Sequence, residues 1–406
     1  MTGDLIAGPA VPIPAHERRE AAWQQSVRGG TVDDRRLRTV VVAVPPAIND
    51  LALELGPALV ARCEDAVRAV AHLDATRGEH LVPLASILLR AESVASSKIE
   101  HEEASIDDFA RALHGVEANS SATAMAASVG AISRLLQGPL DEDSITTAHR
   151  ELFAHNPGER ASAGRWREVQ NWIGGSDYSP RGALYVPPPP DLVAEAMVDL
   201  LAFARRDDVP VLAQSAVMHA QFESIHPVPD GNGRIGRALS AAVLRHRGVA
   251  QHVVIPVAAA LVARREHYFA TLEAYRNGDA GPIIAAFATS ARIAAEEAEL
   301  TAARIAELPG RWDEAAGRPR AGSAARRVLD SLASAPVFST EDLEERLRLP
   351  TATAYRVVER LRRVGVIRPL TERVRNQVWG THDLLVELED LGVRIADRAR
   401  ARPGGL

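Results

Sequence analysis

The residues best suited to chemistry lie in one short stretch, HPVPDGNGRIGR, at positions 226–237. Two glycines flank an asparagine, a histidine and an aspartate precede them, and two arginines follow three residues apart. A Gly-Asn-Gly loop that opens a helix exposes consecutive backbone N–H groups, and the helix dipole adds positive potential there. The stretch therefore predicts a site for an anion.

Each polar side chain of this stretch suits one part of phosphoryl-group chemistry. Arg234 and Arg237 project to the same side of a first helical turn, where both can donate to phosphate oxygens. Asp230 is a hard oxygen ligand suited to a Mg²⁺ ion that travels with a nucleotide. His226 has a pKa range suited to accepting a proton near neutral pH. Alone, such a histidine is more often structural, but the combination indicates phosphoryl-group transfer by positioning and electrostatics.

The elements that position this stretch are expected to be helices. Asp-Gly and Asn-Gly are strong signals for a β-hairpin turn, but the apolar residues on both sides repeat with a period near 3.6. They are Val211, Met218, Phe222 and Ile225 before the stretch, and Ile235, Leu239, Ala242 and Val243 after it. The glycines therefore lie in a loop that joins two helices.

Helical periodicity also predicts helices over most of the remaining chain. The clearest helix covers 84–100, and others are expected over 122–136, 144–154, 191–206 and, as a pair, between 264 and 308. Two β-prone runs, 169–173 and 183–186, flank Gly, Asp and Pro residues and predict an exposed hairpin. The fold class is therefore mainly α, with one exposed β-hairpin that belongs to the helical catalytic core.

Composition excludes several classes of protein. The 406 residues, 46% of them hydrophobic, allow two or three packed domains. The longest apolar run, 253–263, is too short to cross a bilayer, the first residues do not read as a secretory signal, and the lone Cys63 supports no disulfide framework. We therefore expect a cytoplasmic protein without membrane contact. Lys98 is the only lysine and has no glycine near it, which excludes a P-loop and a protein kinase.

The stretch MHAQFESIHPVPDGNGRIGRAL resembles the signature of the Fic family, HPFx(D/E)GNGRxxR. Val228 stands where the family usually has Phe, a side chain that anchors the loop in the core. The resemblance covers residues 45–300 and includes the hairpin, which is similar to the family's flap. It implies a protein adenylyltransferase, which transfers AMP from ATP to a Ser, Thr or Tyr hydroxyl of a target protein or of the chain itself. The matching positions are His226, Pro227, Asp230, Gly231, Asn232, Gly233, Arg234 and Arg237.

The resemblance also implies a role for each matching residue. His226 would deprotonate the target hydroxyl, and Asp230 would hold Mg²⁺ between the α- and β-phosphates of ATP. Gly231, Asn232 and Gly233 would form the anion hole. Arg234 would hold the β-phosphate and Arg237 the γ-phosphate. An extended target segment would pair with the flap by adding a strand. The flap residues are Gly182, Ala183, Leu184, Tyr185 and Val186.

A second element lies in the stretch SVASSKIEHEE. Ser96 and Glu100 are four residues apart and share a helix face, which a solvated polar helix end would also explain. The stretch resembles the family's inhibitory motif (S/T)xxxE(G/N), which implies that Glu100 reaches Arg237 and blocks the γ-phosphate. His101 stands where the family has Gly or Asn, a position for a left-handed residue, and His tolerates that conformation better than most side chains.

The C-terminal part differs from the rest in charge. The net charge of the chain is −6, but residues 323–380 hold 11 Arg against 7 Asp or Glu. Three helices and a β-wing are expected there, similar to a winged helix-turn-helix with 351–364 in the recognition position. We weigh DNA binding and protein contact or dimerisation equally. The residues that would meet a DNA backbone are Arg356, Arg360, Arg363, Arg373 and Arg375.

The predicted organisation has five segments. They are an N-terminal arm (1–45), a helical region with the inhibitory helix (46–137), the catalytic core (138–308), a linker (309–322) and the winged helix (323–390). The leading hypothesis is an adenylyltransferase that uses ATP and Mg²⁺ and is autoinhibited by its own glutamate. The alternatives are a DNA-binding regulator whose Fic domain is a sensor or self-modifier, and a Fic enzyme that removes AMP or transfers another phosphate-linked group. Homodimer formation stays open.

Overall fold

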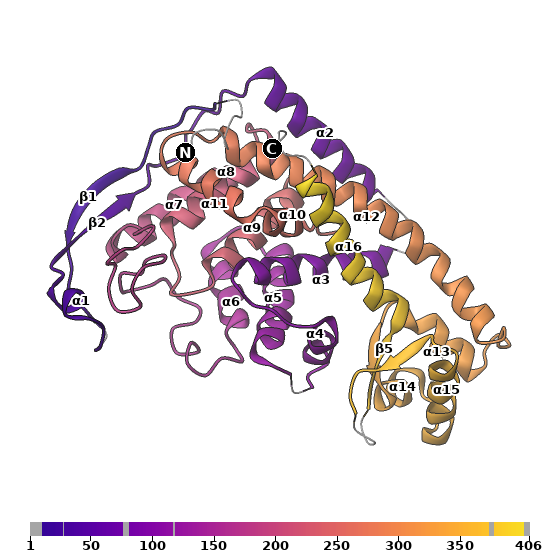
Figure 1. Ribbon diagram of the computed structural model, residues 1–406. Helices are drawn as coiled ribbons and strands as arrows, with labels where there is room; N and C mark the ends of the chain where they lie inside the picture. The colour runs from indigo at the N-terminus through magenta and orange to yellow at the C-terminus, as the bar shows by residue number, and fades with distance from the viewer. Residues whose placement is uncertain (1–9, 27, 76–80, 117, 373–376, 402–406) are drawn as a thin grey trace.

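The computed structural model describes residues 10–26, 28–75, 81–116, 118–372 and 377–401 (Figure 1). Within them the fold is mainly helical, as predicted, with two small antiparallel sheets. None of the described helices is long and apolar enough to span a bilayer. The helices before the C-terminal part are α1 (Val32–Arg36), α2 (Pro57–Asp74), α3 (Leu81–Ile99), α4 (Ile106–Leu113), α5 (Ser120–Gln137), α6 (Glu142–Leu152), α7 (Val193–Ala204), α8 (Val211–Ile225), α9 (Asn232–His246), α10 (Val257–Ala263), α11 (Arg265–Arg276) and α12 (Gly281–Ala315), with the 3₁₀ turn η1 (Pro190–Leu192) before α7.

The two helices predicted around the motif, α8 and α9, form the centre of the molecule. From Leu212 to its end α8 is buried on every side, polar residues included. Several of those polar side chains have internal partners: Gln221 Nε2 donates to the Pro46 carbonyl at 2.7 Å, and His219 Nε2 lies 2.7 Å from the Tyr268 hydroxyl. Such bonds remove the cost of burying polar groups, so α8 is a fixed support for the loop that follows it.

Helix α12 corrects the predicted linker. The segment 309–322 was expected to be non-helical, but α12 continues through Pro309 to Ala315. Proline removes one backbone donor from a helix, yet Leu308 and Trp312 carry the buried face across this point. Trp312 Nε1 also donates to Asp383 Oδ2 at 2.8 Å. Tertiary packing therefore overrides the local signal of PGRWDEAAGRPRAG.

The N-terminal arm contains secondary structure. It forms a hairpin of β1 (Glu17–Ala22) and β2 (Thr39–Val44), in register from Glu17 opposite Val44 to Ala22 opposite Thr39. Upstream of β1, the chain is attached to the distant junction of α11 and α12: Ile13 N–H donates to the Gly278 carbonyl at 3.0 Å, and Ala280 N–H donates to the Val11 carbonyl at 2.9 Å.

The C-terminal part has the three predicted helices followed by two strands, and it adds one strand and a last helix that were not predicted. Its sheet has the order β3-β5-β4, with both pairs antiparallel. The last helix runs ten residues beyond the predicted boundary at 390 and lies along α12 (Figure 1). The elements are α13 (Ala324–Leu332), β3 (Val337–Ser339), α14 (Thr340–Leu347), α15 (Thr351–Arg363), β4 (Ile367–Pro369), β5 (Val378–Thr381) and α16 (His382–Arg400). We refer to residues 323–401 as the C-terminal module, and its winged-helix assignment stays a prediction.

Candidate active site

His226 is fixed at the point where α8 ends and the motif loop begins. It is the C-cap residue, with φ 50° and ψ 57°, and its N–H donates to the Phe222 carbonyl at 2.8 Å. This left-handed conformation turns the chain out of the helix. The imidazole then lies beside Asn232, the first residue of α9.

The imidazole of His226 is neutral at neutral pH. Burial, with a smaller contribution from nearby arginines, lowers its pKa to about 3. Its Nδ1 lies 2.8 Å from the amide nitrogen of Asn171 and 3.1 Å from that of Asn232. The Asn232 amide is held in this orientation because its oxygen accepts from the Val228 N–H at 3.0 Å. Nδ1 is therefore an acceptor here, and the ring proton lies on Nε2.

The loop between the two helices turns tightly at Gly231. Gly231 has φ 76°, and a Cβ at this position would lie 2.8 Å from Leu152 and 2.9 Å from Phe153. Val228 is fully buried, so it fills the position of the family's phenylalanine in the core. The loop ends at the first turn of α9, where N–H groups have no intrahelical partner.

The two motif arginines differ in their partners. Arg234 is buried, with its guanidinium 5.2 Å from the centre of the Phe153 ring and Nη2 3.8 Å from Asp230 Oδ2. Its Nε has no hydrogen-bond partner among the described residues. A buried donor without a partner is costly, so Arg234 is suited to receive an anion.

Arg237, in contrast, is paired with Ser96 of α3 and with Glu100, the residue after that helix. Its Nε donates to Ser96 Oγ at 2.8 Å, and its Nη2 donates to the Ser96 carbonyl at 2.8 Å and to Glu100 Oε1 at 2.7 Å. Burial alone would lower the pKa of Arg237, but the charge of Glu100 raises it above its usual value. A Cβ at Gly233 would overlap Oε1 of Glu100. The carboxylate thus lies directly on the anion nest.

His101 shows how the chain leaves this helix. It has φ 64°, so the position is left-handed, as the resemblance implied. Arg265 of α11 supports the turn: its Nε donates to the Ile99 carbonyl at 3.0 Å, and its Nη2 lies 2.7 Å from His101 Nε2.

Asp230 is placed for a metal that arrives with its ligand. Its side chain is 62% exposed, and Oδ1 accepts from the Gly231 N–H at 2.6 Å. No group of three His, Cys, Asp or Glu side chains suited to a metal occurs among the described residues. One carboxylate fits Mg²⁺, which usually keeps water and binds substrate phosphates besides one or two protein carboxylates. The residues therefore fit a nucleotide-bound ion.

Comparisons with known proteins identify this region. The family model described as Fic/DOC family matches residues 139–244. Residues 139–244 form a Fic domain. A probable protein adenylyltransferase of Aquifex aeolicus is 41% identical over 69 residues, 17% of this chain and 22% of that protein. The protein adenylyltransferase fic-1 of Caenorhabditis elegans is 26% identical over 145 residues, 35% of this chain and 25% of that protein.

A solved structure extends the similarity in fold beyond the Fic domain. A Fic family protein from Desulfovibrio desulfuricans has a TM-score of 0.52 and 21% sequence identity, over 81% of this chain and 97% of the other. This likeness concerns the fold. The chain spans only about a quarter of the length of the two adenylyltransferases that it matches.

The flap of the Fic domain is a hairpin with minimal pairing. A single antiparallel bridge joins Ile173 and Tyr185, whereas the β-prone runs 169–173 and 183–186 were expected to form the two strands of a hairpin. Leu184 is 86% exposed, while the Tyr185 hydroxyl donates to the Ser224 carbonyl at 2.7 Å and so ties the flap to α8. Gly182 has φ 70° at the turn. The rest of the loop is shaped by turns rather than by strand pairing.

The N-terminal arm holds the flap from outside. Asp34 of α1 accepts from Ser179 Oγ at 2.6 Å, and the rings of Trp23 and Trp172 meet edge to face at 5.3 Å. Ala43 of β2 donates to the Val186 carbonyl at 2.9 Å. The arm is thus part of the wall of the site.

Two residues that sequence reasoning missed support the motif loop. Arg167, which is buried, donates from Nε to the His226 carbonyl at 2.9 Å and from Nη2 to the Pro188 carbonyl at 2.5 Å. His149 Nδ1 accepts from Gly164 N–H at 2.8 Å, so its Nε2 is the donor to the Asp230 carbonyl at 3.1 Å. Neither lies in a motif, and only their burial in the fold reveals them.

Three of the five C-terminal arginines, Arg356, Arg360 and Arg363, lie within the described residues, all of them on α15. Arg356 and Arg363 are exposed on α15, and Arg363 lies 3.6 Å from Glu359. Arg360 instead donates to the Ala316 carbonyl at the end of α12. Arg373 and Arg375 lie outside the described residues.

Proposed function

We propose that the protein transfers AMP from ATP to a hydroxyl side chain of a target protein. The observation that carries this proposal is the meeting of a neutral His226, the nest at Gly231 and Gly233, and the partly unpaired Arg234 at the start of α9. The relatives named protein adenylyltransferases support the same reaction.

In the proposed reaction the target oxygen attacks the α-phosphorus, the bond to the β-phosphate oxygen breaks, and pyrophosphate leaves. His226 accepts the hydroxyl proton. Mg²⁺, when bound with ATP, supplies positive charge to the phosphate oxygens, and Asp230 is the residue that would hold it. The free amides of the nest and Arg234 stabilise negative charge on the transferred group.

Before Nε2 of His226 can act as the base, it must lose the proton that it carries. Asn171 Oδ1 is buried without a hydrogen-bond partner, whereas its nitrogen faces Nδ1 of His226. A rotation of this amide would let Oδ1 accept a proton held on Nδ1, and Nε2 would then be free to act as the base. The negative charge of a bound triphosphate would also raise the low pKa of His226.

The proposal includes autoinhibition by Glu100. The Glu100 carboxylate lies in the nest at Gly233 and accepts a hydrogen bond from the guanidinium of Arg237. The γ-phosphate would need both groups. ATP bound beside it would present its α-phosphate to the hydroxyl in the wrong orientation. Charge-assisted bonds of this kind are strong enough to hold the closed state.

The target is proposed to bind along the flap as an added strand. Leu184 projects into solvent and offers an apolar contact to such a segment, while main-chain bonds would set the position of the hydroxyl. Recognition by main-chain bonds admits many target sequences, one of them a segment of this chain.

The test is incubation of the protein with ATP labelled at the α- or the γ-phosphate. Protein label from the α-position alone is the expected result. Label from the γ-position would mean phosphorylation, and no label from a Glu100→Gly variant with any hydroxyl-bearing peptide would overturn the proposal.

DNA binding by the C-terminal module is a second candidate. Arg356 and Arg363, which are exposed on α15, favour this candidate. Arg360 weakens it, because its guanidinium donates to the Ala316 carbonyl. Retention of the full chain on a DNA column at low salt, lost in an Arg356→Ala, Arg363→Ala double variant, is the expected outcome. Equal retention of the two proteins would favour a protein-contact role.

A further inference from the structure

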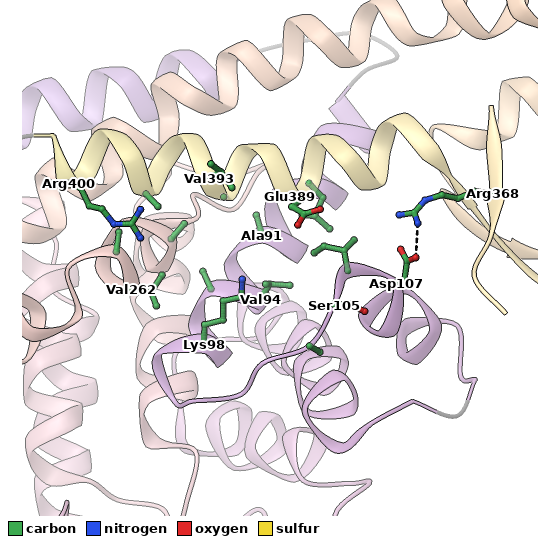
Figure 2. A pocket seen from close by; sticks show the side chains of 18 residues that line it. Ala91, Val94, Lys98, Ser105, Asp107, Val262, Arg368, Glu389, Val393 and Arg400 are labelled. Atoms are coloured by element: carbon green, nitrogen blue, oxygen red, sulfur yellow. Dashed lines mark hydrogen bonds and ion pairs between the residues drawn. The ribbon is translucent and has the colours of Figure 1, made fainter. Parts of the chain in front are cut away.

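A cavity of about 600 Å³ lies beside α3, the helix that we propose to be inhibitory (Figure 2). Its walls come from α3, the start of α4, α10 and α16. The α3 residues that line it alternate with those that reach Arg237: Val94, Ala95 and Lys98 face the cavity, whereas Ser96 and Glu100 bond Arg237. One helix therefore separates the cavity from the nest.

The cavity has an apolar body and a cationic end. Val94, Val262, Leu388 and Val393 line its body. At the end where α16 closes over α10, Figure 2 shows the ammonium group of Lys98 turned toward α16 and the guanidinium of Arg400 turned toward the cavity.

The charges favour an anion at that end. Lys98 makes no hydrogen bond or ion pair with any residue that the structure describes, and Arg400 is paired only with the exposed Asp397, at 3.2 Å. The other polar groups lie further along: Glu389 in the middle, Ser105 at the start of α4, and the Asp107–Arg368 ion pair of 2.6 Å at the far end. An anionic head placed between Lys98 and Arg400 would lie on the Arg400 side of Glu389 and at the opposite end from Asp107.

We propose that this cavity binds a small amphipathic anion, with a carboxylate or phosphate head at Lys98 and Arg400 and an apolar tail along Val94 and Val393. The volume is in the range of ligand sites, and apolar walls with a few converging charges are their usual composition. Burial of the tail supplies affinity and the two cations supply selectivity for an anion.

The ligand would hold the inhibitory helix in place. The cavity exists in the arrangement in which Glu100 is bonded to Arg237, and a ligand that fills it binds that arrangement preferentially. Binding to one of two states shifts the population toward that state. The expected effect is inhibition of AMP transfer, and this step rests on the proposed function.

Decanoate below its micellar concentration is the probe, and decanol is its uncharged analogue. Calorimetric titration without ATP should show one saturable decanoate site and at least about tenfold weaker binding of decanol. Because Lys98 is the only lysine, its acetylation by an amine-reactive reagent, followed by mass spectrometry, should slow when decanoate is bound. Lys98→Met should weaken decanoate binding, and Lys98→Arg should retain it.

Gly392 of α16 offers a variant that plugs the cavity. It lines the cavity, and a Cβ at this position would meet nothing within 4 Å, so Gly392→Leu can extend into the space while improving helix propensity. Gly310→Leu is the matched control, because that helical glycine is exposed and also has open space around it. Decanoate binding should be lost in the first variant and unchanged in the second.

Two results separate this proposal from the proposed function. Equal binding of decanoate and decanol, no saturable site, or full binding by Gly392→Leu would overturn the ligand site whatever the enzyme does. In the transfer assay, saturating decanoate should slow the wild type by about tenfold and leave Glu100→Gly unaffected. Binding without any such slowing would refute the coupling to α3.

Discussion

At the scale of single residues, we expect Asn171 to influence which nitrogen of His226 carries the proton. Asn171→Leu removes the amide beside Nδ1 and should lower AMP transfer by about 10- to 100-fold while ATP binding is retained. Asn171→Asp should retain activity and move the acidic limb of the pH–rate profile to higher pH, since a carboxylate raises the pKa of a neighbouring imidazole. Unchanged rates and pH profiles in both variants would show that Asn171 does not position the base.

Glu223 of α8 is a second residue whose charge matters. Burial raises its pKa to about 7. The folded state therefore holds a proton that the unfolded chain loses above about pH 4.5, and stability falls as pH rises from about 4.5 to 7. Glu223→Gln should gain stability over the wild type across that range, reaching up to ~3 kcal/mol above pH 7.

Urea unfolding of the wild type and Glu223→Gln at pH 5 and pH 8 measures this difference. Glu195→Gln, on an exposed position of α7, is the control, and its effect should be the same at both pH values. A Glu223→Gln effect that is also independent of pH would mean that the carboxyl is ionised in the folded protein.

At the scale of elements, we expect the end of α3 to control the proposed activity. Glu100→Gly should raise self-modification by about 10- to 100-fold, because it frees Arg237 and the nest. Glu103→Gly, three residues on and exposed, is the matched control and should leave the rate unchanged. The double variant Glu100→Gly, Arg237→Ala should lose most of the gain. Self-modification with α-labelled ATP measures all four proteins, and a silent Glu100→Gly would remove α3 from the regulation.

The elements also show how far sequence reasoning reaches. The helices that carry the motif were predicted because their apolar residues repeat with the helical period, and α3, α8 and α9 confirm it. Contacts between segments far apart in the chain leave no such pattern. Arg167 and His149 support the loop through hydrogen bonds to its carbonyl groups, and α12 passes Pro309 because Trp312 is buried against the C-terminal module.

At the scale of the whole molecule, α12 and α16 join the Fic domain and the C-terminal module. Glu387 of α16 accepts from Thr301 at 2.6 Å and from Arg304 at 2.9 Å, both on α12. We therefore expect one calorimetric unfolding transition, with equal calorimetric and van't Hoff enthalpies. Trp312→Ala should lower the free energy of unfolding of the entire chain by about 3–5 kcal/mol. Two resolved transitions would instead mean that the parts unfold separately.

The attachment of the first described residues to the junction of α11 and α12 has a consequence for synthesis on the ribosome. Val11 and Ile13 are made early, but their partners at Gly278 and Ala280 follow more than 260 residues later. At a translation rate of about 5–20 residues per second, the early segment waits on the order of 10 to 50 s for its partners. The arm, and with it the outer support of the flap, is therefore completed only after α11 has been made.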